Sequence, residues 1–301
     1  MAIGGGDRPS KVPFSTGASI LLEGLVNPGA APLVPPPGEL DPSAAAEWGT
    51  EQAGAPRTIA AAVWSPPSDA FQRAMEQTWI AFQPIVRLST RSTYGFEALL
   101  RSSDTLLSDP RLLVDAAERS GRLHDLARRV RTLVAAAAQS LEDGPLIFVN
   151  LRPQELLDDR LLASDDPLGP LAHRCVLELT ERVALDEIPQ ARARIQQLRL
   201  LGYRIAIGNV GSGYADLASI ADLEPDVVKL DLGLIRNLNN ELVRRRLVGG
   251  LLTTCADLNL DSIAEGVETA GERDALGDLG CDLMQGYLFG RPDAGFPRPQ
   301  W

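Results

Sequence analysis

Short apolar runs alternate with longer amphipathic segments from about residue 80 to near the end of the chain. Each run is short enough to be a buried strand, and turn-forming residues bound most of them. We predict strands at Ile80–Val86, Tyr94–Leu100, Leu146–Asn150, Cys175–Leu179, Arg204–Ile207, Val227–Leu230, Ser262–Ala264 and Leu283–Leu288.

The segments between these runs carry apolar residues at helical spacing. We predict helices at Arg122–Leu141, Pro189–Leu201, Asn240–Leu258 and Ala270–Leu279. Gly121, Gly202 and Gly280 stand where such helices would stop. Eight strands separated by helices over roughly two hundred residues predict an α/β fold, a single (β/α)₈ TIM-like barrel. A doubly wound open sheet is the alternative, but no GxGxxG or GxxxxGK loop follows a predicted strand.

The first part of the chain has a different composition. Residues 1–67 hold eleven of the twenty-two prolines, including Pro35–Pro37, with many Gly and Ala. Such a stretch buries too little apolar surface to offset its ordering entropy, so we predict a flexible, largely disordered leader at 1–67 and a barrel domain at 68–301. A docking arm anchored by Ile20–Val26 is the alternative. A short amphipathic helix should lead into the barrel, with apolar positions at Phe71, Met75 and Trp79.

Composition narrows the classes of function. The formal charge of −11 disfavours nucleic-acid binding, which relies on Lys and Arg, but a few local cations could still hold a small phosphorylated ligand. The odd count of cysteines, without any CxxC, indicates a reducing compartment and buried thiols at Cys175, Cys255 and Cys281. No apolar run reaches the length of a membrane span, and the chain does not begin with a secretory signal. We therefore expect a cytoplasmic protein without a membrane span.

Polar residues follow most of the predicted strands. In a barrel enzyme the active site lies at the C-terminal ends of the strands. Three carboxylates, an amide and a lysine stand at these ends: Glu97, Glu178, Glu265, Asn150 and Lys229. Such oxygen ligands suit Mg²⁺, Mn²⁺ or Ca²⁺. Any one of these carboxylates could simply be solvated or paired with an arginine, but that explanation is poor for several successive strand ends.

Several motifs resemble those of the EAL domain, a family of cyclic di-GMP phosphodiesterases. Phe82–Val86 (FQPIV) and Gly95–Arg101 (GFEALLR) are similar to the opening of that domain. The later motifs stand in the family's order at Val149–Leu151 (VNL), Leu177–Glu181 (LELTE), Asp226–Asp231 (DVVKLD), Ala264–Thr269 (AEGVET) and Gly280–Tyr287 (GCDLMQGY). The resemblance covers about 210 residues, from about Trp79 to Pro292.

This resemblance implies a barrel whose first strand runs antiparallel to the others, and two-metal hydrolysis of cyclic di-GMP. It implies metal ligands at Glu97, Asn150, Glu178 and Glu265. Lys229 would orient the attacking water, with Glu265 as its catalytic companion, and Glu181 would brace the loop after the fifth strand. The positions implied to contact or frame the nucleotide are Gln83, Leu99, Arg101, Asp231, Glu268 and Gln285.

One motif departs from the family pattern. After the fifth strand an active member carries Asp-Asp-Phe-Gly, whereas this chain reads Gly208-Asn209-Val210-Gly211. Gly208 offers no ligand atom, and the neutral Asn209 is a weaker ligand than a carboxylate. In a partly buried cleft each missing charge contact is worth several kcal/mol, and about 1.4 kcal/mol is a factor of ten in rate. The sequence therefore predicts a degenerate EAL domain with at most one weak Mg²⁺ or Mn²⁺ site.

Three functions follow from this departure. The first is a catalytically impaired cyclic di-GMP receptor that needs no metal. The second is a scaffold that binds a protein partner and no nucleotide. The third is a weak phosphodiesterase with one metal ion. An unidentified protein partner is expected, and a homodimer is plausible by analogy with the family.

Overall fold

The computed structural model describes residues 68–141, 144–179, 190–211, 220 and 223–301. The predicted leader, residues 1–67, and the predicted bracing residue Glu181 lie outside these ranges.

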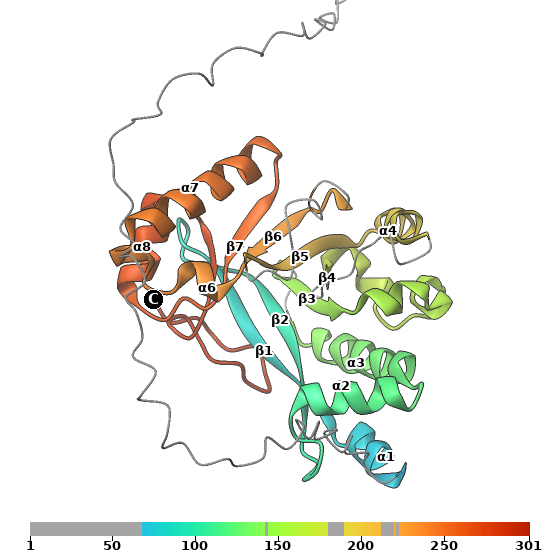
Figure 1. Cartoon of the computed structure of the whole chain (residues 1–301). Coiled ribbons are helices and arrows are strands. Elements are labelled where there is room, and N and C mark those ends of the chain that lie inside the picture. Colours follow the sequence, from blue (N-terminus) through green and yellow to red (C-terminus); the bar gives the residue numbers. More distant parts are fainter. Residues whose placement is uncertain (1–67, 142–143, 180–189, 212–219, 221–222) are drawn as a thin grey trace, which may run out of the picture. The chain divides into compact units, whose positions relative to one another are not determined.

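Eight strands close into one barrel (Figure 1), in which β8 pairs with β1. β1 runs antiparallel to both of its neighbours, whereas the other neighbouring pairs are parallel. The predicted fold and its antiparallel first strand are therefore confirmed. The strands are β1 (Thr78–Arg87), β2 (Ser92–Ser102), β3 (Leu146–Leu151), β4 (Cys175–Leu179), β5 (Arg204–Val210), β6 (Val227–Leu230), β7 (Asp261–Ala264) and β8 (Leu283–Gln285).

Helices surround the barrel, with α2 packed against β2, α3 against β1 and α7 against β7 (Figure 1). The α-helices are α1 (Ser68–Glu76), α2 (Pro110–Arg119), α3 (Leu123–Ala138), α4 (Ala191–Leu200), α6 (Leu232–Ile235), α7 (Leu242–Asp257) and α8 (Ala270–Asp278). Short 3₁₀ segments lie at η2 (Pro153–Leu157), η3 (Asp159–Leu162), η4 (Gly169–Arg174) and η6 (Leu238–Asn240). Gly121, Gly202 and Gly280 follow helix ends with positive φ, which confirms the predicted stops.

Three element predictions need correction. Trp79 belongs to β1 and not to the helix that contains Phe71 and Met75, because α1 ends at Glu76 and the chain becomes extended at Thr78. β8 ends at Gln285 instead of Leu288, since the chain turns at Gly286, where a Cβ atom would lie 2.0 Å from the carbonyl oxygen of Val267. α2 was not among the predicted helices.

The barrel interior has an apolar layer below a polar one. Side chains from seven strands fill the lower layer and are buried: Ile85, Phe148, Val176, Ala206, Val227, Ile263 and Leu283. Residues two positions apart on a strand point to the same face of the sheet. On the parallel strands, the residue two positions after each of these apolar ones therefore also points into the barrel, one layer closer to the C-terminal ends of these strands. On β3, β4, β6, β7 and β8 these are polar, whereas on β5 the residue is Gly208.

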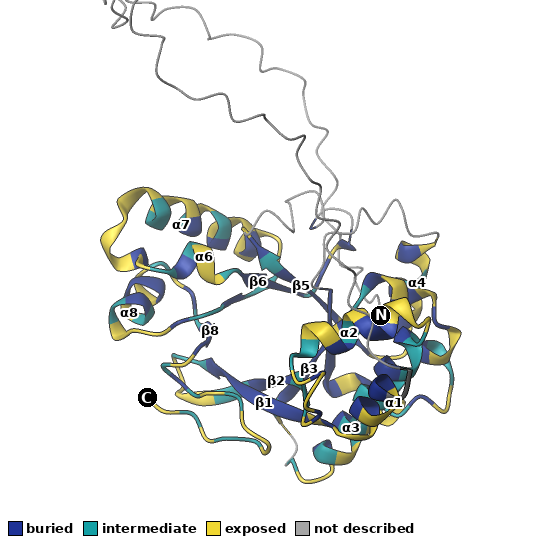
Figure 2. Cartoon of the chain, turned by 60° about the horizontal axis from the view of Figure 1, so that its bottom comes forward, coloured by how far each residue is buried: buried dark blue, intermediate teal, exposed yellow. Residues whose placement is uncertain are grey.

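Figure 2 shows buried strands and helices whose outer sides are exposed. The three cysteines are buried and free, as predicted. On the outside of β1 and β2, the ring of Phe296 packs 4.2 Å from that of Phe82 and 5.0 Å from that of Phe96, so the C-terminal segment covers part of this hairpin. Within the described residues, no helix is long and apolar enough to span a membrane.

Candidate functional site

A fully buried lysine stands at the centre of the polar layer. Lys229 of β6 has no exposed surface. Its Nζ lies 3.1 Å from Oε2 of Glu97, 2.8 Å from Oε2 of Glu178 and 2.7 Å from Oε1 of Glu265. Carboxylates from β2, β4 and the residue after β7 thus share one ammonium group. We call Lys229 and these three glutamates the lysine cluster.

Amide side chains complete the lysine cluster on one side. Gln285 Nε2 donates to Glu97 Oε2 at 2.7 Å and lies 3.1 Å from Oε1 of Gln83. Asn150 Nδ2 donates to Glu97 Oε1 at 3.1 Å. Asn150 is paired with Glu178 across β3 and β4, and Gln83 with Glu97 across β1 and β2, so strand register brings these residues together.

Burial and charge shift the pKa values of the lysine cluster in different directions. Burial alone would lower the pKa of Lys229, but its three carboxylate neighbours hold it well above the ordinary value. Burial raises the pKa of Glu178 to about 8, and the charges of Glu97 and Glu265 add to the rise. Burial also raises the pKa of Glu265.

The pKa of Glu97 moves the other way. Burial would raise it, but the charge of Lys229 and the hydrogen bonds from Gln285 and Asn150 lower it below the ordinary value. One ammonium cannot balance three ionised carboxylates, so the lysine cluster holds an excess of negative potential that attracts a proton or a cation.

The fifth strand, β5, contributes no carboxylate to the lysine cluster. Ile207 pairs with Val228 and Val210 with Leu230, so both Gly208 and Asn209 lie opposite the single residue Lys229 in a β-bulge. Gly208 is buried and Asn209 is half-buried. The φ of Asn209 is 57°, in the left-handed region that asparagine tolerates better than most residues.

Two of the predicted nucleotide-framing residues are engaged in local structure at the rim. Asp231 Oδ1 accepts a hydrogen bond of 2.7 Å from the backbone N–H of Gly233 and caps α6. Glu268 is exposed, and its Oε2 lies 2.7 Å from Nη1 of Arg236. These contacts hold both carboxylates at the barrel mouth but give neither one a place in the lysine cluster.

Two more of the predicted nucleotide-framing residues, Leu99 and Arg101, line a cavity. It has a volume of about 310 Å³ and lies between β2–β4 and the helices α2 and α3. This size lies within the usual range for small-molecule sites. Asn150 lines the cavity too, so the space reaches the edge of the polar layer. Its walls are mainly apolar, and its remaining polar lining comes from Arg111, Arg131, Arg152 and Glu155.

The sequence prediction missed Arg131 and Glu155. A signal was present, because Ala127, Val134 and Ala138 form an apolar stripe on α3 and Arg131 interrupts it at helical spacing. A charge in a buried stripe needs partners, and these come from residues far away in the sequence.

The described residues contain no group of three or more His, Cys, Asp or Glu side chains arranged to hold a metal ion. Lys229 Nζ stands among the three carboxylates that the sequence suggested as metal ligands. Those oxygens are nevertheless the hard donors that a divalent cation prefers, so the donor set fits such an ion if the ammonium moves aside.

Comparisons with known proteins point to one family. The EAL domain model matches residues 68–292. A probable cyclic di-GMP phosphodiesterase of Escherichia coli, PdeN, is 30% identical over 227 residues, which cover 72% of this chain and 44% of that protein. The chain spans between 27% and 56% of the lengths of the first five curated relatives.

Solved structures agree. Klebsiella pneumoniae BlrP1 in a calcium and cyclic di-GMP complex has a TM-score of 0.66 at 27% identity, covering 79% of this chain and 60% of that one. A standalone EAL protein from Vibrio cholerae with bound cyclic di-GMP has a TM-score of 0.63 at 29% identity, covering 74% of this chain and 95% of that one.

Proposed function

Because the chain belongs to the EAL domain family, we propose that it is a catalytically impaired cyclic di-GMP receptor that holds the nucleotide without hydrolysing it. The observation that carries this proposal is the bulge in β5, where Gly208 and Asn209 face Lys229 and neither supplies a carboxylate. Two-metal hydrolysis needs negative ligands for both ions, and the positions facing the lysine are neutral.

Support for nucleotide binding comes from the rest of the rim. Relatives with the same fold are described as cyclic di-GMP complexes. Leu99, Arg101 and Asn150 border a cavity beside the polar layer. A base could enter this cavity while its phosphate stays near the Arg101 guanidinium, which is half-buried and donates to the carbonyl oxygen of Leu100 at 2.8 Å.

A single divalent cation is compatible with this proposal. Glu97, Asn150 and Glu178 would be its ligands, with Glu265 beside them, and the cation would neutralise the excess negative charge of the lysine cluster. The receptor does not depend on it, since the cavity and Arg101 lie outside the cluster.

The test is calorimetric titration of the protein with cyclic di-GMP in EDTA and again with Mg²⁺, followed by chromatography of the nucleotide. We expect binding in both buffers and recovery of intact cyclic di-GMP. Arg101→Ala should weaken binding about ten- to a hundredfold, the value of a hydrogen bond to a charged group. Arg204→Ala, at the first residue of β5 and so at the other end of the barrel, is the control and should bind like the wild type.

A second candidate is a nucleotide-independent scaffold, and the outer face of α7 favours it. Leu242, Val243 and Leu247 of α7, and Leu258 just after it, are 55–73% exposed. Thr253 and Thr254 on the same helix are exposed and donate their hydroxyls to the backbone carbonyls of Gly249 and Gly250, so these hydroxyls are already engaged within the helix. Such a face suits a protein partner or a second copy of the chain. A wild type that binds no cyclic di-GMP, and an oligomer that Leu247→Glu dissociates, would favour this scaffold over the receptor.

A further inference from the structure

An exposed tryptophan stands at the mouth of the barrel. Because β1 is antiparallel to β2, its first residues lie beside the last residues of β2, at the rim where the parallel strands end. The alternation of β1 is regular from Trp79 to Ile85, and both Ile85 and Gln83 point into the barrel. Trp79 therefore points inward too, whereas Ile80 packs outward in the same core cluster as Val134 of α3. The indole is 37% exposed, so it is open to the space above the polar layer.

Arg101 of β2 lies directly opposite Trp79. Side chains paired in this way point to the same face of the sheet, with Cβ atoms about 4.5–5.5 Å apart. Leu100, the neighbour of Arg101, packs on the other face against the cluster that contains Phe71 and Leu113. Arg101 is half-buried and donates to the carbonyl oxygen of Leu100 at 2.8 Å. The mouth of the barrel thus presents an aromatic ring beside a cation.

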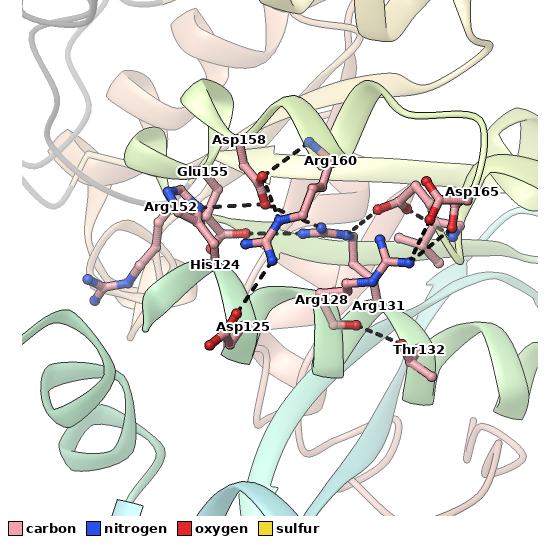
Figure 3. Close-up of polar contacts among 12 residues, drawn as sticks. His124, Asp125, Arg128, Arg131, Thr132, Arg152, Glu155, Asp158, Arg160 and Asp165 are labelled. Atoms are coloured by element: carbon pink, nitrogen blue, oxygen red, sulfur yellow. Dashed lines mark hydrogen bonds and ion pairs between the residues drawn. The ribbon is translucent and has the colours of Figure 1, made fainter. Parts of the chain in front are cut away.

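The cavity lies on the other side of Arg101. Its walls come from β2, β3 and β4 and from α2 and α3, whereas Trp79 belongs to β1. Two of the charged residues in these walls face other protein groups: Arg131 donates to Asp166 at 2.8 Å and lies 3.7 Å from Glu155 (Figure 3). Arg101 therefore stands between a mainly apolar cavity and an exposed indole.

We propose that Trp79 stacks on one guanine base of cyclic di-GMP while the other base occupies the cavity. This inference rests on the receptor function proposed above and adds the residue that holds the second base. Each phosphate of cyclic di-GMP joins its two nucleosides, so a phosphate at Arg101 has a guanine on either side. A base stacks on an aromatic side chain whatever its hydrogen-bonding edge, so Trp79 contributes affinity without reading the base.

The test follows the emission of the indole, which is quenched when guanine stacks on it. Titration of the wild type with cyclic di-GMP in EDTA should quench part of the tryptophan fluorescence. Trp79→Phe keeps a ring that can stack, so calorimetry should show binding within about tenfold of the wild type. Its fluorescence should no longer respond, because the three remaining tryptophans, Trp48, Trp64 and Trp301, are the same in both proteins.

Trp79→Ala removes the stacking surface and should weaken binding about tenfold or more. Leu200→Ala is the control for the loss of an exposed apolar side chain. Leu200 is 87% exposed and ends α4, shortly before β5 begins at Arg204, so it lies at the opposite end of the barrel. This control should bind cyclic di-GMP like the wild type.

The outcomes separate this inference from the function on which it rests. A wild type that shows no calorimetric binding would overturn the receptor function itself. A wild type that binds without quenching, quenching that persists in Trp79→Phe, or full affinity in Trp79→Ala would overturn the role of Trp79 and leave the receptor standing.

Discussion

Two buried cations in this chain each face three carboxylates, and their surroundings differ. Inside the barrel, Lys229 lies within 3.1 Å of Glu97, Glu178 and Glu265. Outside it, Arg131 makes one hydrogen bond and meets its other two carboxylates at 3.7 Å. We call Arg131 with Asp166, Glu155 and Asp158 the arginine cluster. Each cluster holds one cation and three carboxylates, but the ammonium of Lys229 contacts all of its carboxylates closely, whereas Nη1 and Nη2 of Arg131 make no hydrogen bond within the described residues.

This difference separates a polar site that receives no carboxylate from β5 from a buried arginine with few hydrogen bonds. The lysine cluster lies beside the β5 bulge, where Gly208 and Asn209 bring no charge, and its single ammonium contacts all three carboxylates. Arg131 and Glu155 border a cavity, but Nη1 and Nη2 of Arg131 are themselves buried and make no hydrogen bond within the described residues.

The largest loss of stability is expected from replacing Lys229. Lys229→Met leaves three buried carboxylates without their cation, so the free energy of unfolding should fall by about 3–5 kcal/mol. Urea unfolding at pH 8 measures this loss. Arg236→Met removes one partner of the exposed pair with Glu268 and is the control, with an expected loss of at most about 1 kcal/mol. Equal losses in the two variants would contradict the account of a tightly coupled lysine cluster.

A smaller, pH-dependent effect is expected in the arginine cluster. Burial raises the pKa of Glu155 from 4.5 to about 7. Between these values the folded protein binds more protons at this group than the unfolded chain does, so its stability falls as the pH rises through this window. The full cost, about 3 kcal/mol, is present above pH 7.

Glu155→Gln stays neutral and should not show this fall. Urea unfolding at pH 5 and pH 8 should therefore give a wild type that loses stability relative to the variant. Glu76→Gln, at an exposed position on α1, should follow the wild type. Parallel profiles for wild type and Glu155→Gln would show that Glu155 is already ionised in the folded state at pH 5.

The sequence predicted the barrel and much of its polar layer because strand alternation is a local rule. Val176 with Glu178, and Val227 with Lys229, place an apolar residue below a polar one, and the sequence alone displays that pattern. The cavity was not predictable in this way. It depends on how α3 packs against β2–β4 and on the 3₁₀ segment that carries Glu155, which lies 24 residues beyond Arg131 in the chain.

A double substitution on β5 would restore negative charge next to the lysine cluster. Gly208→Asp with Asn209→Asp should allow Mg²⁺ or Mn²⁺ to bind, and saturating metal should then raise the stability by about 2.7 kcal/mol at a hundred times the dissociation constant. Thermal unfolding with and without Mn²⁺ measures this, and the wild type is the control, with a clearly smaller shift. Equal shifts in the two proteins would mean that the carboxylates at these positions do not govern metal binding.

The smallest effect is expected at the start of the chain. Both clusters and the described core lie within residues 68–301, so a chain beginning at Ser68 should retain the melting temperature and the nucleotide affinity of the whole protein. Thermal unfolding and titration of the two lengths test this. A large fall in melting temperature would show that residues 1–67 contribute to the stability of the barrel, with Ile20–Val26 as the first segment to test.

The central claim is recognition of cyclic di-GMP without hydrolysis, and one measurement tests it most directly. The protein, in molar excess over cyclic di-GMP and with Mn²⁺ present, is incubated overnight, and the bound nucleotide is then released and separated by chromatography. We predict that intact cyclic di-GMP is recovered from the protein fraction. Nucleotide that stays unbound would contradict the receptor, and conversion to the linear dinucleotide would show that the site around Lys229 is still a phosphodiesterase.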